Sequence, residues 1–362
     1  MSDPLLLTPL HAWHVAQGAK MAPFAGWDMP IQYTGIIAEH THTRTEASLF
    51  DICHMGEFLL KGAGAKDALA AVVTHNLDTL LPGKCRYGFL LREDGCVRDD
   101  LIVYCLAQDE YMLVVNGACT ASDYAWIVGN LPAPLQLVDI SDATAKIDLQ
   151  GPKAFEALDA VLGTGFKSLK YFNFVQVEFL GAPLIVSRTG YTGELGYEFY
   201  LPTANALALW ERLTADPRVK PAGLGARDTL RLEMGYPLYG QDLDTAHTPS
   251  EAGYESLLNS QADYVGKGAD RRVDSRLVAL AIPGRRSARH HDTVCLPSGE
   301  EVGVVTSGSF APSLGHAVAL AYVTPQAATS TAFVVKAARA ELPAERCDLP
   351  FFLHGTARMK LE

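Results

Sequence analysis

The stretch "HDTVCLPSGEEVGVVTSGSFAP", residues 291–312, alternates short β-branched runs with Gly, Pro and Ser turns and shows almost no helical periodicity. The same pattern continues in "SRLVALAIPG" (275–284), "HAVALAYVT" (316–324) and "STAFVVKAARAELPAE" (330–345). Short, closely spaced strands of this kind are typical of a small β-barrel or β-sandwich. We therefore predict an all-β, barrel-like domain over residues 270–362.

The sequence changes character upstream of this region, with "GKGADRRVDS" (266–275) as the expected joint. Helical patterns occur at 64–77, 151–163, 204–215 and 226–235. Two strand-like runs, "CVRDDLIVYCL" (96–106) and "EYMLVVNG" (110–117), are separated by "AQD" and predict a hairpin. Helix and strand signals thus mix before residue 266, which predicts an α+β protein.

The composition of the chain argues against some classes of binding partner. The 362-residue chain has a formal net charge of −11, which argues against nucleic-acid binding and against attraction to an anionic membrane surface. Its seven cysteines include no C-x-x-C pair, and no run of about 18 apolar residues occurs. No signal or transit peptide is evident. We expect a bacterial-type cytoplasmic protein with reduced thiols, in preference to one of the mitochondrial matrix.

Common cofactor motifs are incomplete. Neither G-x-G-x-x-G nor G-x-x-x-x-G-K-[ST] is present. "DLDTA" (242–246) begins like a calcium loop, but Ala246 stands where the third ligand belongs. We expect no metal and no nicotinamide cofactor.

Two adjacent carboxylates, Asp99 and Asp100, begin the apolar strand "DDLIV". Successive residues of a strand point to opposite faces, so a pocket on one face can use only one of them. Pairing the hairpin about "AQD" brings Asn116 opposite residue 100 or 101. The alternative is structural: a carboxylate that caps a strand, and an Asn that ends its partner.

"SRTGYTGELGYEFYL" (187–201) places three glycines around Tyr191 and then surrounds Glu198 with aromatic residues. A carboxylate in such a place favours a bidentate donor, either an Arg or a ligand edge with two N–H groups. Arg227 of "GLGARDTLRLEMG" (223–235) begins a predicted helix. The alternatives are a water-facing Glu198 and an Arg227 that takes part in surface ion pairs.

These segments together resemble the glycine cleavage T-protein (aminomethyltransferase) family. The resemblance extends through nearly the whole chain in order, carried by residues 8–62, 87–104, 114–117, 187–200, 223–254, 302–323 and 350–358. It implies three domains in a cloverleaf ring around a central folate cavity. The corresponding ranges are 1–50 plus 140–265 for the folate-binding domain, 51–139 for a second α/β domain, and 270–362 for the β-barrel domain.

The resemblance also implies roles for individual residues. Asp100, the second Asp of the "DDL" motif, corresponds to the catalytic residue. Positions of the folate pocket correspond to Tyr87, Asn116, Tyr191, Glu198 and Arg227, with Tyr236 or Tyr239 near the outer half of the folate. In one departure from the family, "EAGY" (251–254) continues as "ESLLNS" without the Trp that is common there.

The implied reaction moves the methylene of an aminomethyl group from a lipoylated carrier (H) protein to tetrahydrofolate, with release of ammonia, as part of glycine breakdown and one-carbon metabolism. The enzyme is expected to be a monomer or a weak oligomer. Asp100, with a reference pKa of about 3.9, would stabilise a developing cation rather than act as a strong base. Two alternatives stay open: a tetrahydrofolate-dependent demethylase of a sulfonium, ether or N-methyl donor, and a folate-binding module without turnover.

Overall fold

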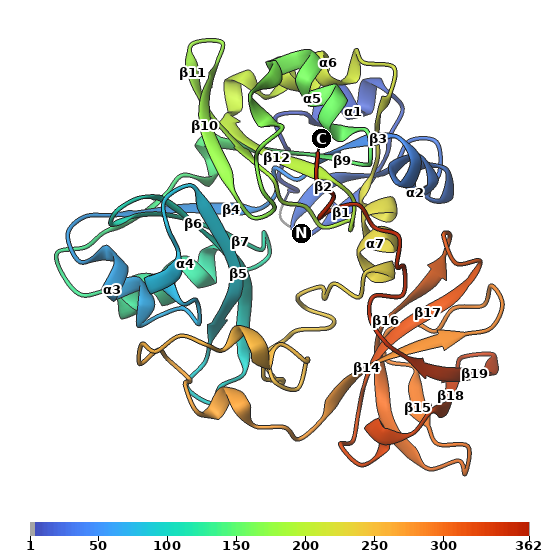
Figure 1. The fold of residues 1–362 in the computed structure, drawn as a ribbon. Helices are drawn as coiled ribbons and strands as arrows, with labels where there is room; N and C mark the ends of the chain where they lie inside the picture. The colour runs from blue at the N-terminus through green and yellow to red at the C-terminus, as the bar shows by residue number, and fades with distance from the viewer. Residues whose placement is uncertain (1–3, 362) are drawn as a thin grey trace.

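A computed structural model describes residues 4–361, and Figure 1 shows three lobes arranged around a common centre. Each lobe is built on its own sheet. A two-stranded ribbon, β1 (Lys20–Phe24) and β2 (Trp27–Gln32), accompanies the first lobe. Single 3₁₀ turns occur at Leu77–Thr79, Ser141–Ala143, Thr164–Phe166, Thr203–Asn205, Glu255–Leu257, Ala269–Arg271 and Ala327–Thr329.

The first lobe contains a six-stranded sheet in the order β10-β11-β12-β9-β3-β13. Its strands are β3 (Ala47–Asp51), β9 (Thr144–Gln150), β10 (Phe174–Phe179), β11 (Ala182–Ser187), β12 (Gly196–Pro202) and β13 (Val219–Pro221). The accompanying helices are α1 (His11–Ala16), α2 (Ile36–Thr45), α5 (Ala154–Leu162), α6 (Ala206–Thr214) and α7 (Leu224–Glu233).

Strand β12 is buried on both faces, and each face packs against a different part of the molecule. Tyr197, Phe199 and Leu201 point into the main core of the first lobe. Glu198 and Tyr200 take the other face, as strand alternation requires. The Tyr200 hydroxyl lies 3.0 Å from that of Tyr104 in the second lobe, so this face looks toward the neighbouring lobe.

The second lobe contains a five-stranded sheet in the order β5-β6-β7-β4-β8, flanked by two helices. Its elements are β4 (Gly56–Lys61), α3 (Ala65–Ala70), β5 (Lys84–Leu91), β6 (Val97–Ala107), β7 (Glu110–Val115), α4 (Thr120–Asn130) and β8 (Leu137–Asp139). The predicted hairpin is present as β6–β7. A bulge between Cys105 and Ala107 adjusts its register near the turn.

The C-terminal lobe is a closed six-stranded barrel, which confirms the prediction of an all-β, barrel-like C-terminal domain. Its strands are β14 (Arg276–Ile282), β15 (Thr293–Cys295), β16 (Glu301–Ala311), β17 (His316–Val323), β18 (Ala332–Ala337) and β19 (Ala340–Cys347).

Strand β17 joins the barrel to the rest of the molecule. Its alternating Ala317, Ala319 and Ala321 fill the narrow barrel interior. Val318 and Leu320 point outward and pack with Leu232 of α7. Strand β17 therefore contributes to two hydrophobic cores, because its small residues face the barrel interior and its branched residues face α7. This packing holds α7 beside the barrel.

The helix predicted over 64–77 is shorter in the structure, because α3 ends at Ala70. Val73 instead forms a bridge with Leu90, and the Thr74 N–H donates to the Phe89 carbonyl. The β-branched run Val72–Val73–Thr74 favours this extended pairing over another helical turn.

Two segments lie elsewhere than we expected. Residues 239–264, which we placed with the first domain, run beneath the second lobe (Figure 1) and pack against Phe89, Leu91 and Val97. Residues 348–361, which we placed with the barrel, return to the first lobe, where the Ala357 N–H donates to the Gly193 carbonyl.

Candidate active site

The "DDLIV" strand delivers its two carboxylates to opposite faces, as strand alternation predicted. Ile102 of β6 pairs with Val114 of β7, and continuing this register brings Asn116 beside residue 100. Asp100 is half-buried on the face that carries Tyr87, whereas Asp99 is fully buried beneath helix α4. Only Asp100 is therefore open to a ligand.

Both oxygens of the Asp100 carboxylate accept hydrogen bonds from side chains. The Tyr87 hydroxyl donates to Oδ2 at 2.9 Å, and the Asn116 side-chain amide donates to Oδ1 at 2.9 Å. The three residues come from β5, β6 and the end of β7, so a rigid sheet sets the orientation of the carboxylate. Strand pairing has brought together three of the residues that the sequence singled out.

Burial raises the pKa of Asp100 to about 7, and the neighbouring Asp99 adds to the rise. The hydrogen bonds from Tyr87 and Asn116 oppose it without cancelling it. Burial thus moves this pKa well above the reference value of about 3.9 on which our expectation for Asp100 was based. An approaching cation would favour its ionised form.

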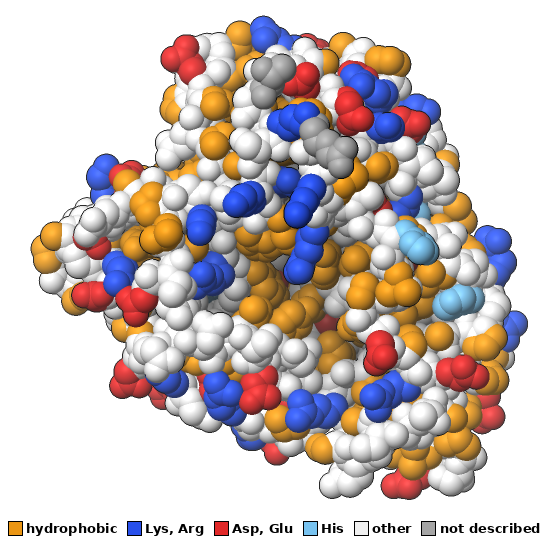
Figure 2. All heavy atoms as spheres, in the orientation of Figure 1, with side chains coloured by type: hydrophobic (Ala, Val, Ile, Leu, Met, Phe, Trp, Pro, Cys, Tyr) orange, Lys and Arg blue, Asp and Glu red, His pale blue; other side chains and the backbone are white. Residues whose placement is uncertain are grey.

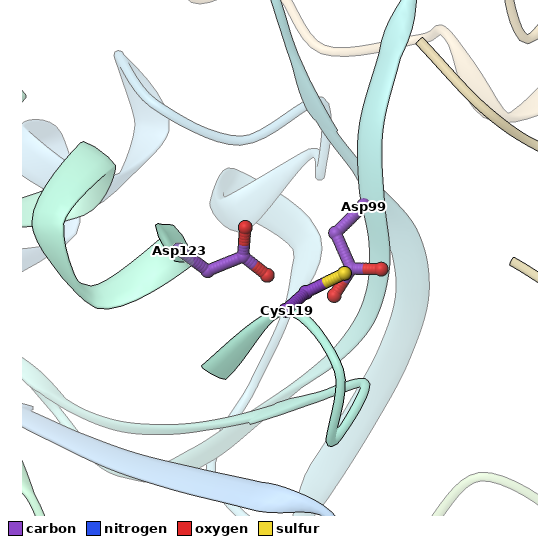
Figure 3. Close-up of side chains that lie close together, drawn as sticks. All are labelled: Asp99, Cys119 and Asp123. Carbon is purple, nitrogen blue, oxygen red and sulfur yellow. The ribbon is translucent and has the colours of Figure 1, made fainter. Parts of the chain in front are cut away.

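Asp99 has a different role from the one we expected. We expected it to face away from the cavity and to take part in a turn or an ion pair, but its oxygens accept hydrogen bonds from the Asn116 backbone at 3.0 Å and side chain at 2.8 Å. On its other side it meets Cys119 and Asp123 (Figure 3). This buried group of two carboxyls and a thiol is the one set in residues 4–361 whose geometry could hold a metal ion.

Glu198 of β12 is buried and has two partners within the protein. Lys146 Nζ lies 3.2 Å from Oε1, and the Thr189 hydroxyl donates to Oε2 at 2.5 Å. Burial alone would raise the pKa of Glu198, but Lys146, Thr189 and Arg227 outweigh it and lower the pKa. The alternative of a water-facing Glu198 is wrong for this structure.

Arg227 pairs with Asp148, a residue that we did not single out. Asp148 lies directly across from Glu198 in the β9–β12 ladder. Two carboxylates and two cations, Lys146 and Arg227, thus meet on one buried face with balanced formal charge. Burial raises the pKa of Asp148 to about 6, with Arg227 opposing the rise and Glu198 adding to it.

Tyr191 links this face to the segment that follows α7. The Arg227 guanidinium lies 5.0 Å from the centre of its ring, and its hydroxyl donates to the Pro237 carbonyl. Burial raises the pKa of the Tyr191 phenol, and Asp100 adds to the rise. The charge of Asp100 in the second lobe is therefore close enough to affect Tyr191 in the first.

Of the two tyrosines in "GYPLYG", Tyr236 stacks on Tyr191, with ring centres 5.9 Å apart and planes at 22°. Tyr239 packs instead with Phe89 and Leu243 against the second lobe. The structure thus groups Tyr236 with the aromatic and basic side chains of the first lobe.

Tyr254 is a site residue that we did not identify. Its ring lies 6.0 Å from Tyr87 and 5.7 Å from Phe89. The signal was its place directly after "EAG", where we noted only that a Trp was missing. Tyr254 supplies an aromatic wall beside Tyr87.

The glycine of "VVNG", Gly117, is required for a steric reason. A Cβ on Gly117 would lie 2.1 Å from the His54 carbonyl oxygen. Only glycine lets the chain pass here, and this path positions Asn116.

Figure 2 shows that the molecule is hollowed where the three lobes meet. Hydrophobic side chains line the hollow, and several Lys and Arg side chains stand at its rim despite the acidic total. Within residues 4–361, no helix combines the length and the hydropathy that crossing a membrane demands.

Comparisons with known proteins agree along the chain. Residues 10–261 match the GCVT N-terminal domain family, and residues 275–352 match the glycine cleavage T-protein C-terminal barrel domain. Aminomethyltransferases of Halothermothrix orenii and Synechococcus elongatus are 42% and 44% identical, with alignments covering 89% of this chain in both cases and 92% and 89% of those proteins. The crystal structure of glycine cleavage system aminomethyltransferase T from Bartonella henselae superposes with a TM-score of 0.91 at 32% identity, covering 97% of this chain and 99% of that one.

Proposed function

The chain belongs to the glycine cleavage T-protein family of aminomethyltransferases, and from that premise we propose how its residues carry out the transfer. The donor is the aminomethyl group, H₂N–CH₂–S, on the lipoyl arm of a carrier protein. A nitrogen of tetrahydrofolate attacks the methylene carbon. The C–S bond breaks, its electron pair stays on the sulfur, and ammonia leaves as the second folate nitrogen closes the methylene bridge.

The proposal rests on one observation above the others: the Asp100 carboxylate is held on both oxygens by Tyr87 and Asn116 and is only half-buried, so that a ligand can reach it. As the C–S bond breaks, the methylene group gains the positive charge of an iminium ion. A fixed carboxylate in a poorly solvated site stabilises that charge more strongly than water does. With its pKa near 7, Asp100 can also accept and return a proton as the attacking nitrogen changes its bonding.

Glu198 is proposed to accept the paired N–H groups at the edge of the pterin ring. Lys146 and Thr189 occupy one position on each oxygen and keep the carboxylate ionised, and each oxygen retains a further lone pair. Tyr87, Tyr191 and Tyr254 supply flat apolar contacts, and Tyr236 extends this surface outward. Arg227, anchored by Asp148, contributes its positive charge at the same end.

The alternatives predict different products from the same assay. Purified protein is mixed with tetrahydrofolate and, in separate reactions, with the aminomethyl-lipoyl carrier, dimethylsulfoniopropionate or sarcosine. Methylenetetrahydrofolate and ammonia from the carrier reaction alone, identified by mass, would support the proposal. Methyltetrahydrofolate from a methyl donor would instead identify a demethylase, and binding without turnover would indicate a folate-binding module.

A further inference from the structure

Asp123 of helix α4 is a buried carboxylate without a donor. Its side chain has no exposed surface, and neither oxygen receives a hydrogen bond from any N–H or hydroxyl group of residues 4–361. The Arg98 Nε is 3.6 Å from Oδ1, too far for a hydrogen bond, and the Arg98 guanidinium packs instead on Trp126 at 4.7 Å. Arg98 thus offers Asp123 a nearby positive charge but no hydrogen bond, and an additional proton would supply the missing donor.

The carboxyl group of Asp99 lies close to that of Asp123, as Figure 3 shows, with the Cys119 sulfur beside them. Asp99 is likewise fully buried, and its hydrogen bonds with Asn116 satisfy part of its capacity to accept. Two carboxylates that lie this close to each other cannot both stay charged in an interior without water.

We infer that Asp99 and Asp123 share one proton, and that this acid pair is the positioning device that holds Asn116 and, through it, the Asp100 carboxylate. The inference rests on the proposed role of Asp100. It gives Asp123 the donor that it lacks and leaves one negative charge on the pair in place of two.

The connection to the reacting carboxylate runs through a single amide. Asn116 Nδ2 donates to Asp99 Oδ1 at 2.8 Å and to Asp100 Oδ1 at 2.9 Å. Its backbone N–H also donates to Asp99, which fixes the residue at two points. The order is therefore Asp123, Asp99, Asn116, Asp100, from the helix to the cavity.

The pKa directions agree with this geometry. Burial, then the charge of Asp123 and the hydrogen bond to it, raises the pKa of Asp99 well above its usual range. Burial raises the pKa of Asp123 to about 6. The other ionisable groups facing the pair are Arg98, Cys119, Asp100 and Tyr239. Burial and Asp99 raise the pKa of the Cys119 thiol, which keeps it neutral.

The first test counts protons without using activity. Infrared difference spectra should show a carbonyl-stretch band from a protonated carboxyl group that is lost in Asp99→Asn and in Asp123→Asn. Unfolding at pH 7 should release about one proton fewer from Asp123→Asn than from wild type, because an unfolded aspartate is ionised at that pH. Asp142→Asn, which changes an exposed carboxylate in the turn between β8 and β9, is the control and should change neither readout.

The second test measures positioning. Asp123→Ala should lower kcat by about tenfold, the lower end of the cost of losing an outer-shell partner at a metal site. Asp123→Asn, which can still bond to Asp99, should keep most of kcat. Tetrahydrofolate affinity should stay near wild type in both variants. If both variants kept wild-type kcat and pH profile, the pair would have no positioning role.

Three further results would overturn the shared proton: no protonated-carboxyl band that is lost in Asp99→Asn and Asp123→Asn, an unchanged proton release in Asp123→Asn, or one equivalent of a divalent metal in the purified protein that is absent from Asp123→Ala. These readouts do not depend on turnover. If wild type failed to transfer the aminomethyl group, the proposed function would fail, while the spectra and proton count would still decide whether the pair shares a proton.

Discussion

Asp99 and Asp100 are neighbours of the same residue type, and their surroundings make them different. Asp99 is enclosed between β6 and α4, whereas Asp100 is half-buried and held by Tyr87 and Asn116. Their mutual repulsion couples their titration, so pH-dependent data will report the cluster rather than one site. Substitution can still separate their roles, because only Asp100 faces the cavity.

Asp100→Asn should lower kcat by about 10²–10³-fold, the typical cost of removing one preorganised electrostatic group. The change keeps the shape but removes the charge that offsets the forming cation, so tetrahydrofolate affinity should change little. Steady-state kinetics and calorimetry measure the two quantities. An Asp100→Asn enzyme with wild-type kcat would contradict the assignment.

The acid limb of kcat/KM in wild type should have an apparent pKa near 7, because Asp100 stabilises a cation only when ionised. Activity should therefore fall as the pH drops below that value. Tyr87→Phe keeps the ring but removes a hydrogen bond that lowers this pKa, so the limb should move to higher pH. A limb that stayed in place in Tyr87→Phe, or persisted in Asp100→Asn, would assign the titration to another group.

At the scale of elements, strand β9 shows where sequence patterns mislead. Lys146, Asp148 and Gln150 alternate with apolar residues, a pattern typical of one water-facing side. In the structure all three are buried, because Glu198 and Arg227 from other elements balance the charges. The sequence pattern of β9 cannot predict these ion-pair partners, because they come from β12 and α7.

Local sequence patterns predicted the contacts that depend on elements adjacent in the chain. Alternation separated Asp99 from Asp100, hairpin pairing brought Asn116 to residue 100, and turn-rich β runs predicted the barrel. The rest depended on tertiary packing. Asp123 meets Asp99 only because α4 folds back over the sheet, and Arg227 selects Asp148 only after β9 pairs with β12.

Glu198→Gln should weaken tetrahydrofolate binding by about 2 kcal/mol, or roughly 30-fold in Kd, since a neutral amide cannot accept both N–H groups of the pterin edge. Calorimetry measures the change. Glu178→Gln, at an exposed position on β10, is the matched control and should bind normally. Equal affinity in both variants would remove Glu198 from the folate site.

At the scale of the whole molecule, the tail after the barrel holds the site loop in place. The Thr356 hydroxyl donates to Glu194 at 2.5 Å and accepts the Leu195 N–H at 2.8 Å. Phe352 packs under the Arg44 guanidinium at 4.3 Å. The loop between Tyr191 and Glu198 is thus fixed by residues more than 150 positions away in the chain.

Thr356→Val should lower the free energy of unfolding by about 1–3 kcal/mol, because it removes a hydrogen bond to the buried Glu194 carboxylate and leaves the Leu195 N–H without its acceptor. Urea denaturation measures the loss. Thr331→Val, at an exposed position on the barrel, is the control and should change stability little. Equal stability of the two variants would show that the tail contributes no anchoring through this hydroxyl.

The ring arrangement favours a donor carried on a long arm. In our proposal we place the reacting groups Asp100 and Tyr191 within the hollow, and Figure 2 shows Lys and Arg side chains at its rim, where a carrier protein too large to enter would stay. Contacts at the rim position the arm without joining in the chemistry, and such remote contacts increase the rate at the reacting atoms.

Free aminomethyl-lipoamide should therefore react with kcat/KM at least about tenfold below that of the carrier-bound donor. Raising the salt concentration should narrow this gap by screening the rim charges, whereas the rate with free aminomethyl-lipoamide should barely change. Equal kcat/KM for the two donors would remove the carrier protein from the mechanism, and a gap that did not respond to salt would assign its recognition to apolar contacts.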